Sequence, residues 1–133
     1  MEPNEALAEL LDLSSQIEDV AILGASGLVL AGSGTPERCQ QLARIAAELV
    51  AAAGDVRPSG DVSRIEVALD SSSVFVISEG GRTAVATTVP EPTAGLVVYD
   101  LRTALRRLDD EAVFKPPRKR KKDQADVDID ADA

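Results

Sequence analysis

The stretch VAILGASGLVLAGSG, residues 20–34, decides the fold of this chain because it fits two different structures. In the first, residues 20–23 form a parallel strand, and the glycine-containing turn after them opens a helix and holds a pyrophosphate. That fingerprint needs a third glycine where this chain has Leu30, and residues 28–31 are too few for the helix. In the second, two apolar strands flank a turn in which Gly27 supplies the necessary backbone freedom. We therefore predict a hairpin and no nucleotide-binding loop.

Apolar periodicity outside this hairpin predicts three helices and three further strands. Helices are expected where apolar side chains recur at three- and four-residue steps, over residues 5–16, 36–53 and 96–109. The second helix begins at Pro36, and Gly54 stands where a C-terminal cap is expected. Strands separated by short polar or glycine turns are expected over residues 64–70, 73–78 and 82–89.

The predicted order of elements is therefore α-β-β-α-β-β-β-α. Several strands are apolar on both faces, so both faces of the sheet need cover. We expect an α/β domain of the three-layer α+β kind, spanning residues 1–114. In it, a five-stranded antiparallel sheet carries one helix on one face and two helices on the other.

Composition narrows the function of the 133-residue chain. It contains no Trp and no His. Histidine is both the commonest general base and the commonest metal ligand, so the chain lacks the usual residue for either role. Its single cysteine, Cys39, cannot form an internal disulfide, which favours a reducing compartment. No apolar run approaches the ~20 residues of a membrane span, and the acidic start does not resemble a signal peptide. We expect a cytoplasmic protein without a transmembrane segment.

Charge is distributed unevenly along the chain. Residues 1–114 carry 8 basic and 18 acidic side chains, so this part should repel nucleic acid and anionic lipid. Residues 115–133 are rich in charge, Pro and Ala, and we expect a disordered tail, basic first and then acidic. Only its basic block could contact nucleic acid, an anionic membrane or an acidic partner. The basic residues concerned are Arg118, Lys119, Arg120, Lys121 and Lys122.

The order and spacing of these elements resemble the Roadblock (dynein light chain) family. The matching segments are residues 17–23, residues 26–31, the Ala- and Leu-rich helix 36–53, the turn at 80–81 and residues 94–97. One departure is the turn before Gly27, where the family often carries an acidic residue and this chain has Ser26. The resemblance implies a non-catalytic dimer whose sheet continues across a two-fold axis. Proteins of this family bind small Ras-like GTPases or motor and scaffold proteins. Its bacterial and archaeal members look like proteins that regulate a partner GTPase.

By this resemblance, residues 36–53 and the strand at 64–70 would form the dimer seam. The residues expected in the dimer or partner interface are Ala43, Ala47, Val50, Ala51, Glu66 and Ala68. Arg82 follows the glycine turn at 80–81, is expected to be exposed there and could contact a GTPase, but we expect a modest contact from it and not a catalytic arginine finger.

No catalytic, cofactor-binding or metal-binding residues are predicted. The carboxylates fall mostly in turns and at the ends of elements, where Asp and Glu are common because these places are solvated. The phosphate-loop pattern is missing, so the chain is not expected to be a GTPase itself. Two other functions stay open: a sensory module, profilin-like or PAS-like, that holds a small ligand, and a pure scaffold without a GTPase partner. Sensor pockets usually carry aromatic side chains, and this chain has two Phe and one Tyr.

Overall fold

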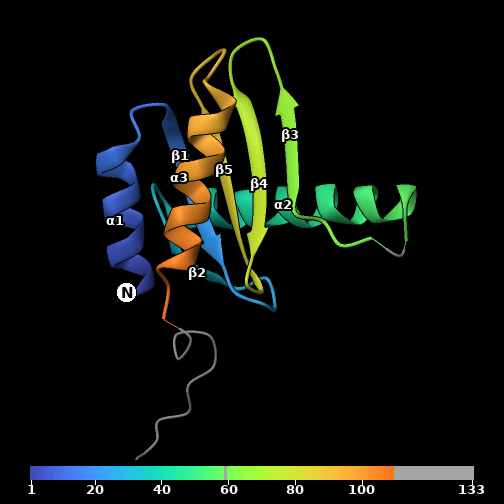
Figure 1. The fold of residues 1–133 in the computed structure, drawn as a ribbon, viewed down its shortest axis with the longest axis horizontal. Helices are drawn as coiled ribbons and strands as arrows, with labels where there is room; N and C mark the ends of the chain where they lie inside the picture. Colours follow the sequence, from blue (N-terminus) through green and yellow to red (C-terminus); the bar gives the residue numbers. More distant parts are fainter. Residues whose placement is uncertain (59, 110–133) are drawn as a thin grey trace, which may run out of the picture.

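Five antiparallel strands form one sheet with helices on both faces in the computed structural model of the chain (Figure 1). The structure describes residues 1–58 and 60–109. The elements are α1 (Pro3–Leu13), β1 (Ile17–Leu23), β2 (Val29–Gly32), α2 (Pro36–Val56), β3 (Arg64–Ala68), β4 (Ser73–Glu79), β5 (Arg82–Thr88) and α3 (Ala94–Arg106). The strand order across the sheet is β2-β1-β5-β4-β3. The predicted fold class and element order are confirmed.

The helices divide between the two faces as predicted. Helix α2 alone covers one face, where Leu42 and Ala46 pack against Val76 and Val85 of the central strands. Helices α1 and α3 lie side by side on the other face and share a larger core around Phe75. Figure 1 shows α2 running across the strands on the far side of the sheet from α1 and α3.

Strand β1 shows why the sheet needs cover on both sides. Successive side chains of a strand point to opposite faces. Val20 and Ile22 accordingly join the core under α1 and α3, while Ala21 and Leu23 join the core under α2. All four side chains are buried, which accounts for the continuous apolar run in the sequence.

The stretch that decides the fold is a hairpin, as predicted. Strands β1 and β2 pair antiparallel, with a register shift between Ile22 and Leu23. In the turn, Gly24 donates its N–H to the carbonyl of Leu28 at 2.9 Å, and Gly27 adopts a φ of 88°. That positive φ favours glycine, so Gly27 serves the turn and opens no helix.

Helix boundaries differ from the prediction in three places. Helix α2 continues through Gly54 to Val56, so the predicted cap at Gly54 is wrong. Glycine inside a helix costs only about 0.5–1 kcal/mol relative to alanine, too little to end a long helix. Helices α1 and α3 each begin two residues earlier and end three residues earlier than predicted. At the start of α1, Pro3 takes the first helical position and the Glu5 carboxylate accepts the N–H of Glu2 at 3.1 Å.

The predicted boundary at residue 114 and the predicted tail, including the basic block, lie outside the described residues. None of the described helices has the length and apolar character needed to cross a membrane.

Candidate partner interface

Strand β3 is one edge of the sheet, and its outer side has no neighbouring strand in the described chain. It pairs with β4 at every position from Arg64 to Ala68. Along it, Arg64, Glu66 and Ala68 are exposed, while Ile65 and Val67 are half-buried. An edge strand presents a row of unpaired N–H and C=O groups, which makes it a template for pairing with another chain.

The two halves of α2 differ in burial. All of its buried residues, Cys39, Leu42 and Ala46, fall in the first half. Residues 47–56 contain none, and Val56 at the end of the helix is 80% exposed. Figure 1 shows that this part of α2 extends beyond β3, past the edge of its own sheet. We call β3 together with residues 47–56 the open edge.

A hollow lies between the end of α2 and β3, at the open edge itself. It has a volume of about 260 Å³ and is lined by residues of both elements, among them Ala53, Arg57 and Ile65. Leu69, just after β3, is 55% exposed. Unfilled space and exposed apolar side chains therefore coincide at this edge, a combination that marks interaction surfaces.

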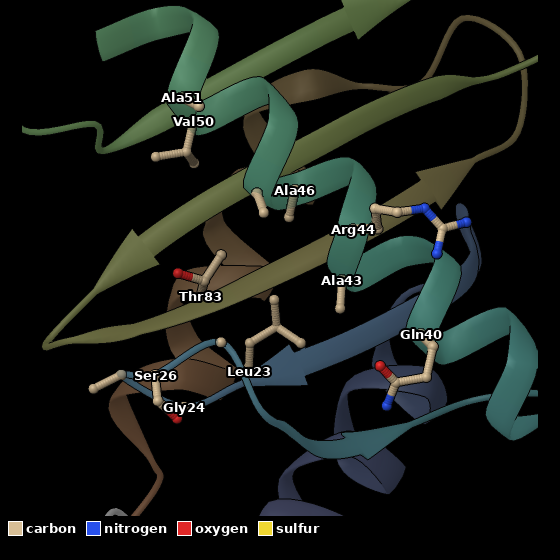
Figure 2. Close-up of a pocket in the computed structure, with 13 residues that line it drawn as sticks. Leu23, Gly24, Ser26, Gln40, Ala43, Arg44, Ala46, Val50, Ala51 and Thr83 are labelled. Carbon is tan, nitrogen blue, oxygen red and sulfur yellow. The ribbon is translucent and has the colours of Figure 1, made fainter.

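A larger pocket of about 600 Å³ lies along one flank of α2 (Figure 2). Leu23 at the end of β1 points toward Ala43 of the helix, and Thr83 of β5 lies beside it. The β1–β2 turn forms one rim, and Gln40 and Arg44 stand on the helix at one end of the pocket. The lining is mostly small and apolar, and its polar side chains are Ser26, Gln40, Arg44 and Thr83.

The structure brings together four of the six predicted interface residues. Ala43, Ala47, Val50 and Ala51 all line the pocket beside α2. Ala47 and Ala51 are exposed, and the other two are half-buried.

The other two predicted interface residues, Glu66 and Ala68, lie elsewhere. Glu66 sits opposite Phe75 of β4, and Phe75 belongs to the core under α1 and α3. Because directly paired residues share a face of the sheet, Glu66 and Ala68 face away from α2. The Glu66 carboxylate pairs with Arg64 at 3.2 Å. The side chains of β3 on the α2 side are Ile65 and Val67, which the prediction did not name.

Arg82 is not exposed, so the expectation that it projects from the glycine turn is wrong. Its side chain is only 5% exposed. Its guanidinium donates to the carbonyl of Asp109 at 2.6 Å and to the carbonyl of Leu108 at 3.4 Å. Arg82 therefore anchors the chain that follows α3. Its contact with a GTPase stays a prediction that this burial disfavours.

Sequence reasoning missed Gln40, Arg44 and Thr83 as pocket residues. Positions 40, 44, 47 and 51 follow one another at helical steps of four and three, so the stripe through Ala47 and Ala51 contained the first two. Thr83 reaches the pocket only because β5 lies next to β1, and the strand order was not predicted.

Metal-ligating side chains do not come together as a binding cluster in the described part of the chain. Residues 1–58 and 60–109 contain no group of three or more His, Cys, Asp or Glu side chains placed to hold a metal ion. The geometry there offers backbone pairing at β3 and an apolar surface along α2, which are means of binding another protein.

Comparison with known proteins gives a family and a set of similar folds. The model of the Roadblock/LC7 domain family matches residues 3–87. A solved Roadblock/LC7 domain from Streptomyces avermitilis has a TM-score of 0.69 and 22% identity, over 80% of this chain and 93% of that one. The gliding protein MglB from Thermus thermophilus has a TM-score of 0.60 and 18% identity, over 77% of this chain and 84% of that one. A solved MglB with a tetrameric arrangement has a TM-score of 0.61 and 17% identity, over 75% of this chain and 79% of that one. A comparison with curated proteins found no match.

Proposed function

The chain belongs to the Roadblock/LC7 domain family, and on that basis we propose that it is a non-catalytic homodimeric module that binds and regulates a small Ras-like GTPase. The observation that carries the proposal is the open edge: an unpaired strand β3 beside a helix that extends past it. Resemblance to a family of GTPase-binding dimers supplies the partner class, and the tetrameric arrangement of an MglB supports self-association.

A second copy of the chain fits the open edge by symmetry. In a two-fold dimer the same patch is used on both sides, so β3 of one copy would run antiparallel to β3 of the other. The two sheets would then form one continuous sheet, and the bare N–H and C=O groups of both strands would be satisfied. Residues 47–56 of each α2 would extend over the partner's β3 and cover Ile65 and Val67 there.

The pocket along α2 offers a surface for the GTPase. Its small residues, Ala43 and Gly27, let another backbone approach closely, and Arg44 at one end could pair with a carboxylate of the partner. Because Arg82 is buried, we expect no arginine finger from it. Regulation would come instead from holding the switch segments of the GTPase, which requires tighter binding to one nucleotide state.

A small-ligand sensor is the second candidate, favoured by one observation. The pocket volume of about 600 Å³ falls within the 300–1,000 Å³ that is usual for ligand sites. Its lining contains no aromatic side chain, which weakens this alternative.

The test uses Ala51→Glu, with Ala8→Glu as its matched control. Both alanines are exposed on helices, but Ala8 lies on α1, away from the open edge. A buried carboxylate at a dimer seam is costly, so Ala51→Glu should weaken dimerisation by at least about tenfold, or about 1.4 kcal/mol. Ala8→Glu should leave it unchanged. Sedimentation equilibrium over micromolar concentrations gives both dissociation constants.

The GTPase part is tested separately. Purified Ras-like GTPases from the same cell, loaded with GDP or a non-hydrolysable GTP analogue, are titrated with the dimer. We expect one of them to bind in a nucleotide-dependent way. A dimer that binds none in either state would be a pure scaffold, and a monomer at tens of micromolar would contradict the dimer itself.

A further inference from the structure

The backbone of β3 alternates between groups that bond β4 and groups that face outward. At one end of the strand the carbonyl of Ser63 accepts the N–H of Ser78 at 3.0 Å, and at the other end Leu69 donates its N–H to the carbonyl of Ser72 at 2.8 Å. In an antiparallel pair, every second residue makes both of its bonds to the same neighbour. Because 63 and 69 are both odd, the odd-numbered residues of β3 bond β4. The outward N–H and C=O groups belong to the even-numbered residues, which are Arg64, Glu66 and Ala68.

The side chains of this edge are divided between the two faces of the sheet. Ile65 pairs with Val76, which belongs to the core under α2. Successive side chains of a strand alternate between faces, so Val67 and Leu69 also lie on the α2 side. Ile65 and Val67 are half-buried there, and Leu69 is exposed. The α2 side of the edge is therefore apolar, and the opposite side carries its charged residues.

A two-fold axis perpendicular to the sheet allows β3 to meet its own copy in only a few registers. Such an axis passes between one residue and the same residue of the partner, and residues at equal distances on either side of it pair. An axis at Arg64 or at Glu66 would place identical charges opposite each other. An axis at residue 68 would place Glu66 opposite the partner's Asp70. Like charges directly opposite each other destabilise a strand pair, so two positions for the axis are left, Ile65 and Val67.

The apolar side chains distinguish these two registers. With the axis at Ile65, Val67 would lie opposite the partner's Ser63, and Leu69 opposite the partner's Asp61. With the axis at Val67, each Val67 lies opposite its own copy and Ile65 lies opposite the partner's Leu69. Leu69 is 55% exposed in the described chain, and only in this second register does it meet an apolar side chain across the seam. Burial of apolar surface therefore favours the axis at Val67.

The same register brings opposite charges together at both ends of the seam. It places Arg64 of each copy beside Asp70 of the other, in the turn that follows β3, and both residues are exposed. The Arg64 guanidinium already pairs with Glu66 of its own strand at 3.2 Å. A guanidinium has five N–H donors, so it can bond a second carboxylate without giving up the first. Glu66 itself would lie opposite the partner's Ala68, which is small and uncharged.

We propose that β3 accepts a second copy of this chain in one register, with the two-fold axis at Val67, and that Arg64 and Asp70 are the residues that select it. The inference rests on the proposed dimer through β3 and adds how that edge recognises its partner. An edge strand with a different order of charges would place like or unpaired charges at the seam and would pair less well. Arg64 and Asp70 thereby direct an otherwise general backbone interaction toward a second copy of the chain.

Single cysteines measure the register directly. In a Cys39→Ala background, Ile65→Cys, Glu66→Cys and Val67→Cys are oxidised mildly and compared on non-reducing gels. Across the axis, opposing Cα atoms of a pair without hydrogen bonds lie about 4.5 Å apart, within the range of a disulfide. Val67→Cys should therefore cross-link into dimers at least about tenfold faster than the other two. At positions 65 and 66 the two copies are offset along the strand by about 13 Å and about 7 Å, which is too far.

The cysteine experiment separates failure of the register from failure of the proposed dimer. Faster cross-linking of Ile65→Cys or Glu66→Cys than of Val67→Cys would keep the β3 seam and overturn the register. Failure to cross-link at all three positions would overturn the β3 seam together with the register.

Charge reversal tests the selection by Arg64 and Asp70. Arg64→Asp and Asp70→Arg each place like charges side by side twice in the dimer, so each should weaken its own dimer about tenfold or more. An equimolar mixture of the two variants pairs opposite charges at both contacts, and its dissociation constant in sedimentation equilibrium should return to within about threefold of the unmodified value. The matched controls are Arg106→Asp on α3 and Asp12→Arg on α1, which are exposed away from the open edge and should leave dimerisation unchanged. A mixture that dimerises no better than the separate variants would overturn the proposed roles of Arg64 and Asp70.

Discussion

The two edges of the sheet are built differently. Strand β2 has four residues, its pairing with β1 contains a register shift, and both α1 and α2 contact it. Just after it, the Ser33 hydroxyl accepts the N–H of Val20 at 2.9 Å, which ties the chain back to β1. Strand β3 has five residues in unbroken pairing with β4, and its extensive contacts within the described chain are with β4 alone.

This difference indicates where a partner is expected. Proteins close an edge with short strands, bulges and covering elements when it must not pair with another chain. The β2 edge has all three of these features, whereas the β3 edge has none of them and lies beside a helix half without buried residues. An edge left regular and uncovered is suited to pairing.

The largest expected effect is on the free energy of unfolding, and it differs between substitutions in the two halves of α2. Leu42 is fully buried under the first half, and Leu42→Ala should lower the free energy of unfolding by about 2–5 kcal/mol. Val56, at the end of the second half, is 80% exposed, so Val56→Ala should change the stability of the isolated protomer by less than about 0.5 kcal/mol. Urea unfolding at submicromolar concentration measures both. Similar losses for the two variants would mean that the second half also belongs to the core of the protomer.

Arg82 and Arg106 compare the contribution of a buried arginine to stability with that of an exposed one. Its buried guanidinium bonds two carbonyls after α3, so Arg82→Ala should cost about 1.5–3 kcal/mol. Arg106 pairs with Glu79 at 2.9 Å on the surface, and Arg106→Ala should cost less than about 1 kcal/mol. If the protein stimulates a GTPase, Arg82→Ala should change that rate by less than about tenfold. Loss of all stimulation with binding intact would make Arg82 a catalytic finger and refute this mechanism.

A smaller effect on stability is expected at the β2 edge, where Gly32 lies close to Cys39 of α2. A Cβ added at Gly32 would lie 2.3 Å from the sulfur of Cys39 on α2, so something must shift. Gly32→Ala should therefore cost about 1–3 kcal/mol. In a Cys39→Ala background the cost should fall, because the sulfur is gone, and a double-mutant cycle gives the difference. An unchanged cost in both backgrounds would place the strain elsewhere at this edge.

Local pattern predicted most of the fold and only part of the interface. The hairpin could be recognised because residues 28–31 are too short for a helix, and the layers followed from strands apolar on both faces. The order of the strands in the sheet could not be predicted, because it depends on which strands pair in the folded chain. Thr83 was therefore not predicted as a pocket residue. Arg82 was placed in an exposed loop because it follows two glycines, but a side chain of that length can turn inward to bond carbonyls after α3. The pattern predicts a cap at Gly54, but α2 continues through it because residue propensity is a weak guide inside a long helix.

The central claim is that β3 pairs with β3 of a second copy, and hydrogen exchange tests it most directly. Alternate N–H groups of an edge strand point away from its neighbour, so they are protected only if another strand bonds them. At tens of micromolar, the outward amides of Arg64–Ala68 should exchange as slowly as those of β4 and β5. In Ala51→Glu they should exchange quickly, while the amides of β2 stay unchanged. Fast exchange of these β3 amides in the unmodified protein, at a concentration where it sediments as a dimer, would show that the dimer uses another surface and would contradict the account.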